Sequence, residues 1–335
     1  MKAIKFFAIS AMAAAMITSC SSEDELSQSN YPSDNIVRVT AGVNNAKTRA
    51  EGAGTEMKND FSLTIVNKNA PKYTYTDKVF SKKSGDWACS ETLLWQKSDA
   101  LVDIVAFAPA QTGKFNGVYA NGSIQPIAYS VADDQSTKSD NNDLLYYYAK
   151  DFNPGTSLVN KKLSIQFNHA FCMIDIVVTL GTEFNKPKVL DDSPIVKVTL
   201  DGTKIAANVD VKNAVTGSTT TTAASVVTAS ETATPTTITT TKGTFTKAAN
   251  EEANAKSCFS CIAIPQTVAA NTFKVSLMTA GKRYEWTSAE PVELKSGYRY
   301  TLKLSMGNDV VLLKGGSISA TPWTEITSDK PLETD

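Results

Sequence analysis

The sequence predicts an all-β fold made of two tandem β-sandwich domains. Short segments alternate apolar and polar residues, and the first of them places Val37, Val39, Ala41 and Val43 on one face. No segment carries a sustained apolar stripe at helical spacing. Turn dipeptides such as Asn121-Gly122 separate the segments, as is typical of sandwiches. The 335 residues are enough for two hydrophobic cores.

The first residues are typical of an export signal. The run Ile4–Ile17 is almost entirely apolar and too short to span a bilayer comfortably. It ends in Ile17-Thr18-Ser19-Cys20, which resembles a lipobox. This resemblance implies a lipid on Cys20 and cleavage before it, so that residues 1–19 form a lipoprotein signal peptide. An ordinary signal peptide followed by a chance cysteine is the alternative.

Residues 20–35 carry no periodicity, and we interpret them as a flexible tether. Glu23, Asp24 and Glu25 follow closely on Cys20 and resemble the surface-export signal of Bacteroidetes lipoproteins. The alternative is that these acidic residues only keep the tether solvated. We favour exposure on the cell surface.

Strand signals then follow one another to the end of the chain. The predicted strands cover residues 36–43, 61–65, 101–108, 144–149, 163–169, 173–180, 195–200, 204–211, 258–264, 272–278, 282–286, 298–304 and 310–313.

A cluster of turn-forming residues at Asn153–Ser157 marks the expected domain boundary. It divides the mature chain into an N-terminal domain of residues 36–157 and a C-terminal domain of residues 158–335. Residues 216–241 are dominated by threonine, which favours an exposed hairpin or loop over a glycosylated stalk or a ligand-facing strand.

Composition and motifs argue against nucleic-acid binding and against catalysis. The formal net charge of −1 provides no basic field that would neutralise phosphates. The one histidine, His169, ends a predicted strand, where a structural hydrogen bond is the expected role. The sequence contains no nucleophile elbow, phosphate-binding loop or zincin motif. We expect no enzyme activity, no cofactor and no metal.

Two further groups of residues have a structural and a functional interpretation. Cys258 and Cys261 form a CxxC motif, but on a strand they face opposite sides, which favours structural thiols over a redox or zinc site. A disulfide with Cys89 or Cys172 is the remaining option, because the periplasm is oxidising. The acidic pairs Asp133-Asp134 and Asp191-Asp192 lack the spacing of a calcium loop and are expected in solvated turns.

Trp87 and Trp95 flank Cys89 and could stack on sugar rings or cover a core. We favour the core, since four tryptophans are not unusual in two sandwiches.

Several segments carry a family resemblance through their order and spacing. They are Val37–Val43, Thr48–Ala50, Val102–Pro109, Asn142–Ala149, Leu163–Ala170, Ile262–Gln266, Lys295–Tyr300 and Ile318–Trp323. Together they resemble the fimbrillin family of Bacteroidetes, the Mfa-like and FimA-like pilins. The resemblance implies two transthyretin-like β-sandwich domains and assembly into pili or related surface fibres.

The resemblance also implies a maturation step. A trypsin-like protease cuts the lipidated precursor after an arginine, here between Arg49 and Ala50, and the strand before the cut is displaced. A strand from another subunit then fills the vacated groove. The displaced strand would carry Val37, Val39, Ala41 and Val43, and the candidate donor strand carries Val310, Leu312, Ile318 and Ala320. The alternative is that both ends are ordinary paired strands and that Arg49 is only a surface residue.

The sequence therefore predicts a fimbrillin-like pilus subunit or accessory adhesin in the outer membrane, exposed on the cell surface. The expected partners are other pilin subunits, the outer membrane through the lipid anchor, and a host or glycan receptor. Stalk, tip and anchor positions all fit. The alternative function is that of a surface glycan-binding lipoprotein.

Overall fold

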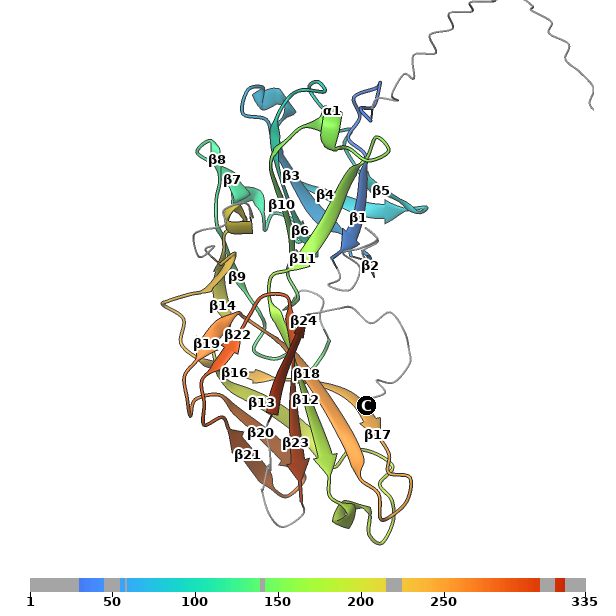
Figure 1. The fold of residues 1–335 in the computed structure, drawn as a ribbon, viewed down its shortest axis with the longest axis vertical. Coiled ribbons are helices and arrows are strands. Elements are labelled where there is room, and N and C mark those ends of the chain that lie inside the picture. The colour runs from blue at the N-terminus through green and yellow to red at the C-terminus, as the bar shows by residue number, and fades with distance from the viewer. Residues whose placement is uncertain are drawn as a thin grey trace, which may run out of the picture.

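The computed structural model describes residues 30–44, 55–57, 59–138, 142–214, 225–307 and 317–322. These residues form strands, one α-helix and short 3₁₀ turns, which confirms the all-β prediction. Figure 1 shows one β-structured region above another along the long axis of the molecule. Within the described ranges, no helix has the length and apolar character that crossing a bilayer requires.

The first region is an eight-stranded sheet in the order β11-β10-β6-β3-β4-β5-β1-β2. Its strands are β1 (Val39–Val43), β2 (Thr55–Glu56), β3 (Phe61–Val66), β4 (Tyr75–Lys83), β5 (Asp86–Cys89), β6 (Val102–Ala108), β10 (Leu145–Phe152) and β11 (Leu163–His169). Because β1 also pairs with β11, seven of these strands form a closed ring. Closure removes exposed sheet edges, which an open sandwich of the kind we predicted would retain.

The interior of the ring holds the first core. In β11 the alternation seen in the sequence places Leu163, Ile165 and Phe167 inside. Strand β6 is buried on both faces: Ile104 points into the ring, and Val105 points into a second cluster outside it. Burial on both faces explains why this segment is a continuous apolar run rather than an alternating one.

The second region is a two-layer sandwich. One layer has the order β17-β18-β12-β23-β24 and the other β16-β13-β20-β21. The strands are β12 (Cys172–Leu180), β13 (Ile195–Thr203), β16 (Thr236–Thr239), β17 (Thr241–Thr246), β18 (Ala255–Ala263), β20 (Lys274–Thr279), β21 (Arg283–Thr287), β23 (Tyr298–Met306) and β24 (Ser317–Pro322). Both layers contribute side chains to one core, so this region matches the predicted sandwich.

Smaller elements join the two regions. Strand β9 (Ile127–Ser130) pairs with β14 (Ala206–Val209), which pairs with β15 (Val227–Ala229), so one small sheet contains strands from both halves of the chain. The side chain of buried Gln135 donates to the carbonyl oxygens of Ala132 and Ile262 and accepts a hydrogen bond from the Ile262 amide. The two regions therefore share hydrogen bonds as well as apolar contacts.

The remaining elements are short. They are β7 (Tyr119–Ala120), β8 (Ser123–Ile124), β19 (Gln266–Val268), β22 (Val292–Leu294), the helix α1 (Pro154–Ser157), and 3₁₀ turns at Pro71–Tyr73, Asn116–Val118, Thr182–Asn185 and Val211–Ala214.

The turn cluster that we expected to divide the domains lies inside the first region. Asn153 caps α1 by accepting a hydrogen bond from the Gly155 amide. Strand β11, which follows the expected boundary at residue 157, pairs with β10 and β1 in the first sheet. We therefore propose that the boundary lies between His169 and Cys172, where the chain passes from β11 to β12.

Candidate functional site

Strand β1 is the candidate strand-exchange site, and its backbone is held on both sides. It runs parallel to β11 from the pair Val39–Leu163 to the pair Val43–Phe167. On the other side, the Val37 amide donates to the Leu93 carbonyl at 2.9 Å. The predicted strand began at residue 36, whereas the regular ladder begins at Val39 and is preceded by an isolated bridge between Ile36 and Leu94.

The side chains of β1 and the residues just before it alternate as predicted. Val37, Val39 and Val43 are 6%, 3% and 3% exposed and belong to the core of the ring. Ala41 is half-buried and packs against the same core, while Thr40 is exposed. Burial of each valine stabilises the ring by about 1.5–3 kcal/mol.

The position of β1 in the ring means that its loss would expose a neighbouring strand. It lies between β5 and β11, so its removal would leave β11 with an unpaired edge beside an apolar groove. Such an edge binds a strand readily, since backbone hydrogen bonds supply affinity and alternating side chains supply register. The groove left by β1 would accept a strand that, like β1, runs parallel to β11 and carries apolar residues at every second position.

The candidate donor residues are only partly described. Ile318 and Ala320 lie on β24, which pairs with β23 at the edge of the sandwich. Ile318 is half-buried against the second core, and Ala320 is exposed. The other predicted site residues, Cys20, Arg49, Ala50, Val310 and Leu312, lie outside the described residues.

His169 is buried near the junction of the two regions and contacts a carboxylate. Its Nδ1 atom lies 3.1 Å from both carboxylate oxygens of Asp143. The pairing orients the imidazole, as expected for a structural histidine. The sequence offered no signal for this partner, because the loop that holds Asp143 meets β11 only in the folded chain. Among the described residues, no group of three or more histidine, cysteine or acidic residues is placed to hold a metal ion.

The described cysteines are free thiols. Cys261 is buried and Cys258 half-buried, on opposite faces of β18 as the spacing predicts. Burial, with a smaller contribution from the Asp175 charge, raises the pKa of Cys261 to about 12. Burial likewise raises the pKa of Cys172. Thiols held in their protonated form are poor nucleophiles and poor metal ligands.

The two tryptophans weighed as sugar platforms cover the first core. Trp95 is 2% exposed, and its ring stacks on Phe152. Trp87 is half-buried, with its ring centroid 4.9 Å from that of Phe61. Core packing accounts for both residues.

The acidic pair Asp191-Asp192 lies in an exposed turn and bonds to lysines. Hydrogen bonds from Lys247 and Lys188 lower the pKa of Asp191 to about 2. Asp192 contacts Lys242 at 3.1 Å. These ion pairs are exposed and screened by solvent, so they are worth little to stability.

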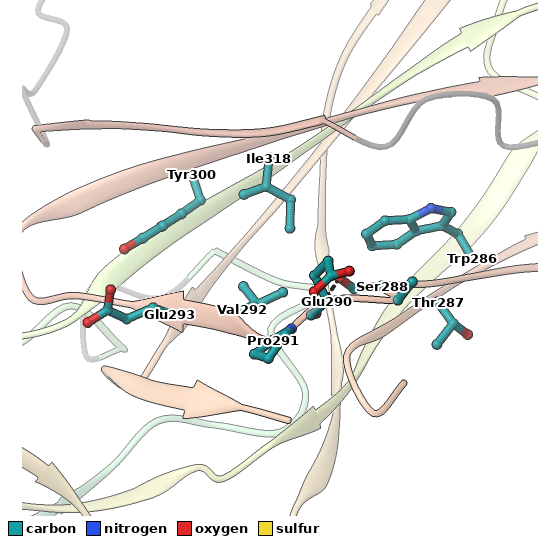
Figure 2. Close-up of a pocket in the computed structure, with 10 residues that line it drawn as sticks. Trp286, Thr287, Ser288, Glu290, Pro291, Val292, Glu293, Tyr300 and Ile318 are labelled. Atoms are coloured by element: carbon teal, nitrogen blue, oxygen red, sulfur yellow. Dashed lines mark hydrogen bonds between the residues drawn. The ribbon is translucent and has the colours of Figure 1, made fainter. Parts of the chain in front are cut away.

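A cavity that the sequence did not indicate lies at the edge of the second region (Figure 2). It measures about 530 Å³ and is bounded by the chain from β21 into β22 and by Tyr300 and Ile318 of β23 and β24. In the view of Figure 2, Trp286 and Tyr300 stand on opposite sides of the open space.

Comparison with known proteins places this geometry in a family. The chain matches the model of the fimbrillin-like family over residues 48–323. No curated protein sequence matches the chain.

The fold is similar to those of several crystallised Bacteroides proteins. A putative cell adhesion protein of Bacteroides ovatus is 15% identical, with a TM-score of 0.57 over 88% of this chain and 99% of that one. Another, from Bacteroides uniformis, is 13% identical, with a TM-score of 0.51 over 88% and 99%. A fimbrial protein of Bacteroides vulgatus is 15% identical, with a TM-score of 0.50 over 87% and 98%. With its family model matched along most of its length, the chain belongs to the fimbrillin-like family.

Proposed function

We propose that this protein is a fimbrial subunit or accessory adhesin whose strand β1 is exchanged for a strand of another subunit. The observation that carries the proposal is the combination of properties in β1. Its valines are buried, it completes the ring, and it precedes the segment that contains Arg49. A strand with these properties holds the precursor folded until it is removed.

Proteolysis between Arg49 and Ala50 starts the exchange. Before the cut, β1 is part of the same chain, and an incoming strand competes against a very high local concentration. After the cut, β1 is a separate peptide that can dissociate. The groove beside β11 then takes up an apolar strand from another subunit, for which residues 310–320 are the candidate donor.

Export and anchoring come first in this sequence of events. The signal peptide and the lipid on Cys20 hold the precursor at the outer membrane, with its folded part on the cell surface. The chain acts through assembly and adhesion and carries no catalytic activity. Its partners are other pilin subunits and a receptor on another cell or surface.

Limited trypsin digestion of the purified precursor tests the exchange. We expect cleavage near Arg49 to convert the monomer into a ladder of oligomers that resist detergent on gels. Trypsin also cuts after lysine, so the matched control is the double variant Lys47→Ala/Arg49→Ala, which should stay monomeric under the same digestion. A wild-type product that is cut at Arg49 and remains a stable monomer would contradict the proposal.

Sequencing of the protein recovered from intact cell surfaces tests the order of steps. A chain that begins at acylated Cys20 is the unprocessed precursor or an anchor subunit. A chain that begins at Ala50 is the processed subunit. Recovery of neither terminus would refute the proposed processing.

A further inference from the structure

The cavity at the edge of the second region lies where the two layers of the sandwich separate. Its walls are the chain from Trp286 to Glu293, together with Tyr300 and Ile318 from the edge of the facing layer. A volume of about 530 Å³ lies within the range of roughly 300–1,000 Å³ that is usual for small-molecule sites. The cavity belongs to the second region, and β22 lies below β1 in the view of Figure 1.

The aromatic wall of the cavity is fixed in place. Trp286 lies on β21, paired with Val275 of β20. Its ring meets the buried ring of Phe273 edge-on, with centroids 6.3 Å apart. The indole is only half-buried, so one part rests on the core and the rest is presented to the cavity. A platform held in this way loses little conformational freedom when a ligand binds.

The loop after Trp286 is also held by hydrogen bonds. The Ser288 amide donates to the Phe273 carbonyl at 3.0 Å, and the Ser288 carbonyl accepts from the Asn271 amide at 2.8 Å. The Ser288 hydroxyl donates to the Glu290 carbonyl at 2.7 Å. Figure 2 shows the side chains of Pro291 and Glu290 in this loop between Trp286 and Val292. The cavity is therefore formed before any ligand arrives.

The polar groups around the cavity are suited to hydroxyl groups. Tyr300 accepts a hydrogen bond from the Lys295 amide at 2.8 Å, and its own O–H can donate to a ligand. A tyrosine hydroxyl keeps its proton at neutral pH, and burial raises the pKa of Tyr300 further above its ordinary value. Glu290 is exposed at the mouth and offers two acceptor oxygens, and Glu293 bonds to Lys295 at 3.0 Å.

We propose that this cavity binds a pyranose residue of a neutral glycan, with the sugar ring lying on Trp286. The ring hydrogens of a pyranose are weakly positive and pack well on the negative face of an indole. Sugar hydroxyls donate to the Glu290 carboxylate and accept from Tyr300. Apolar contacts with Val292 and Ile318 complete a pocket that is partly apolar and partly polar.

A cationic side chain fits the same cavity less well. An ammonium group would gain from Trp286 and Glu290. It has no acceptor for the Tyr300 O–H, however, whereas a sugar hydroxyl both donates and accepts hydrogen bonds. The Glu293–Lys295 ion pair is neutral as a unit and favours neither ligand.

This inference goes beyond the proposed function. Binding requires the folded second region with β24 in place, because Ile318 of β24 forms part of the wall. Ile318 also lies in the candidate donor segment, so the inference applies to the uncleaved precursor, which should bind glycan as a monomer before any strand exchange.

The test is saturation-transfer NMR and calorimetry with the full precursor against soluble oligosaccharides. The probes are maltotriose, mannotriose, N-acetyllactosamine and xylotriose, with a lysine-containing tripeptide as the cationic comparison. We expect at least one sugar to bind, and Trp286→Ala and Glu290→Gln each to weaken it tenfold or more. Trp286→Phe keeps an aromatic face and should recover part of the loss.

Glu285→Gln is the matched control, since Glu285 is exposed on β21 next to Trp286 and faces the opposite side of the strand. It should leave sugar affinity unchanged. Thermal unfolding of each variant shows whether it is folded. The proposal is overturned if none of the sugars binds, if they bind equally well to the folded Trp286→Ala and Glu290→Gln variants, or if only the tripeptide binds.

Discussion

Substitution of Val39 should weaken the binding of the β1 fragment to the ring once the chain is cut. The loss of binding free energy follows from the burial of Val39. Val39 is 3% exposed within the core of the ring, so Val39→Ser removes about 1.5–3 kcal/mol of apolar burial. This loss corresponds to a roughly 10- to 100-fold higher Kd for the β1 fragment. Thr40→Ser changes an exposed residue of the same strand and should have little effect.

The assay replaces residues 45–50 with the recognition site of a specific protease, so that cutting leaves β1 as a bound peptide. A fluorescent peptide of residues 35–44 is then added, and its uptake is followed by fluorescence anisotropy. We expect uptake after cutting only, and faster uptake by the Val39→Ser protein than by the Thr40→Ser protein. Equal uptake by the two variants, or none in any cut protein, would refute the view that valine burial retains β1.

Three further predictions concern stability. Gln135→Ala leaves the backbone groups of Ile262 without their side-chain partner and should lower the free energy of unfolding by about 2–4 kcal/mol in urea titrations. Half-buried Gln166→Ala is its control, with an expected loss below about 1 kcal/mol. Burial, with a smaller contribution from Asp143, raises the pKa of Tyr129 to about 12. Between pH 10 and 12 the unfolded chain gives up this proton while the folded chain keeps it. The free energy of unfolding should therefore fall by about 1.4 kcal/mol per pH unit in this range, and Tyr129→Phe should reduce that slope. Gly202→Ala should lower the free energy of unfolding by ~1–3 kcal/mol in thermal melts, because φ is +91° and a Cβ would collide with the Thr272 carbonyl. Gly281→Ala is its control and should be close to neutral, since a Cβ there would contact nothing.

Local patterns predicted the strands that are regular and buried on one face. Alternation located β11, because a side chain facing the core at every second position leaves a clear signal, and the apolar run that follows located β12. Strand β4 was missed, since most of its residues are only half-buried and Asp77 interrupts it with a positive φ. Strand β16 was missed within the threonine-rich segment, where Ile238 is its only buried residue.

Pairing between distant segments could not be predicted from local patterns. Nothing in the sequence around Leu163 shows that β11 lies beside β1, and so the turn cluster before it looked like a domain boundary. The Asp201-Gly202 dipeptide shows the same limit of local patterns. Its sequence is typical of a turn, but β13 continues through it to Thr203, with a register shift between Leu200 and Thr203.

The candidate site was predicted in part for similar reasons. Val37, Val39 and Val43 could be identified because a buried face repeats along one strand. The cavity beside Trp286 could not, because its walls come from β21, β23 and β24, and their meeting depends on the sandwich as a whole.

The parallel alignment of β1 and β11 gives the proposed assembly a direction. β11 begins just after α1, so β1 also begins at the α1 end and runs toward the second region (Figure 1). A replacement strand in the same direction would have its first residue at the α1 end. The candidate donor residues 310–320 follow the folded part of their own chain, so the molecule that donates them would lie beyond the α1 end. Leu101 and Val159 precede β6 and β11 at the α1 end, and they are 48% and 57% exposed. We expect these two side chains to contact the donating subunit. A fibre built in this way would be polar, because each subunit would accept a strand beside β11 and donate its own residues 310–320 to the next subunit.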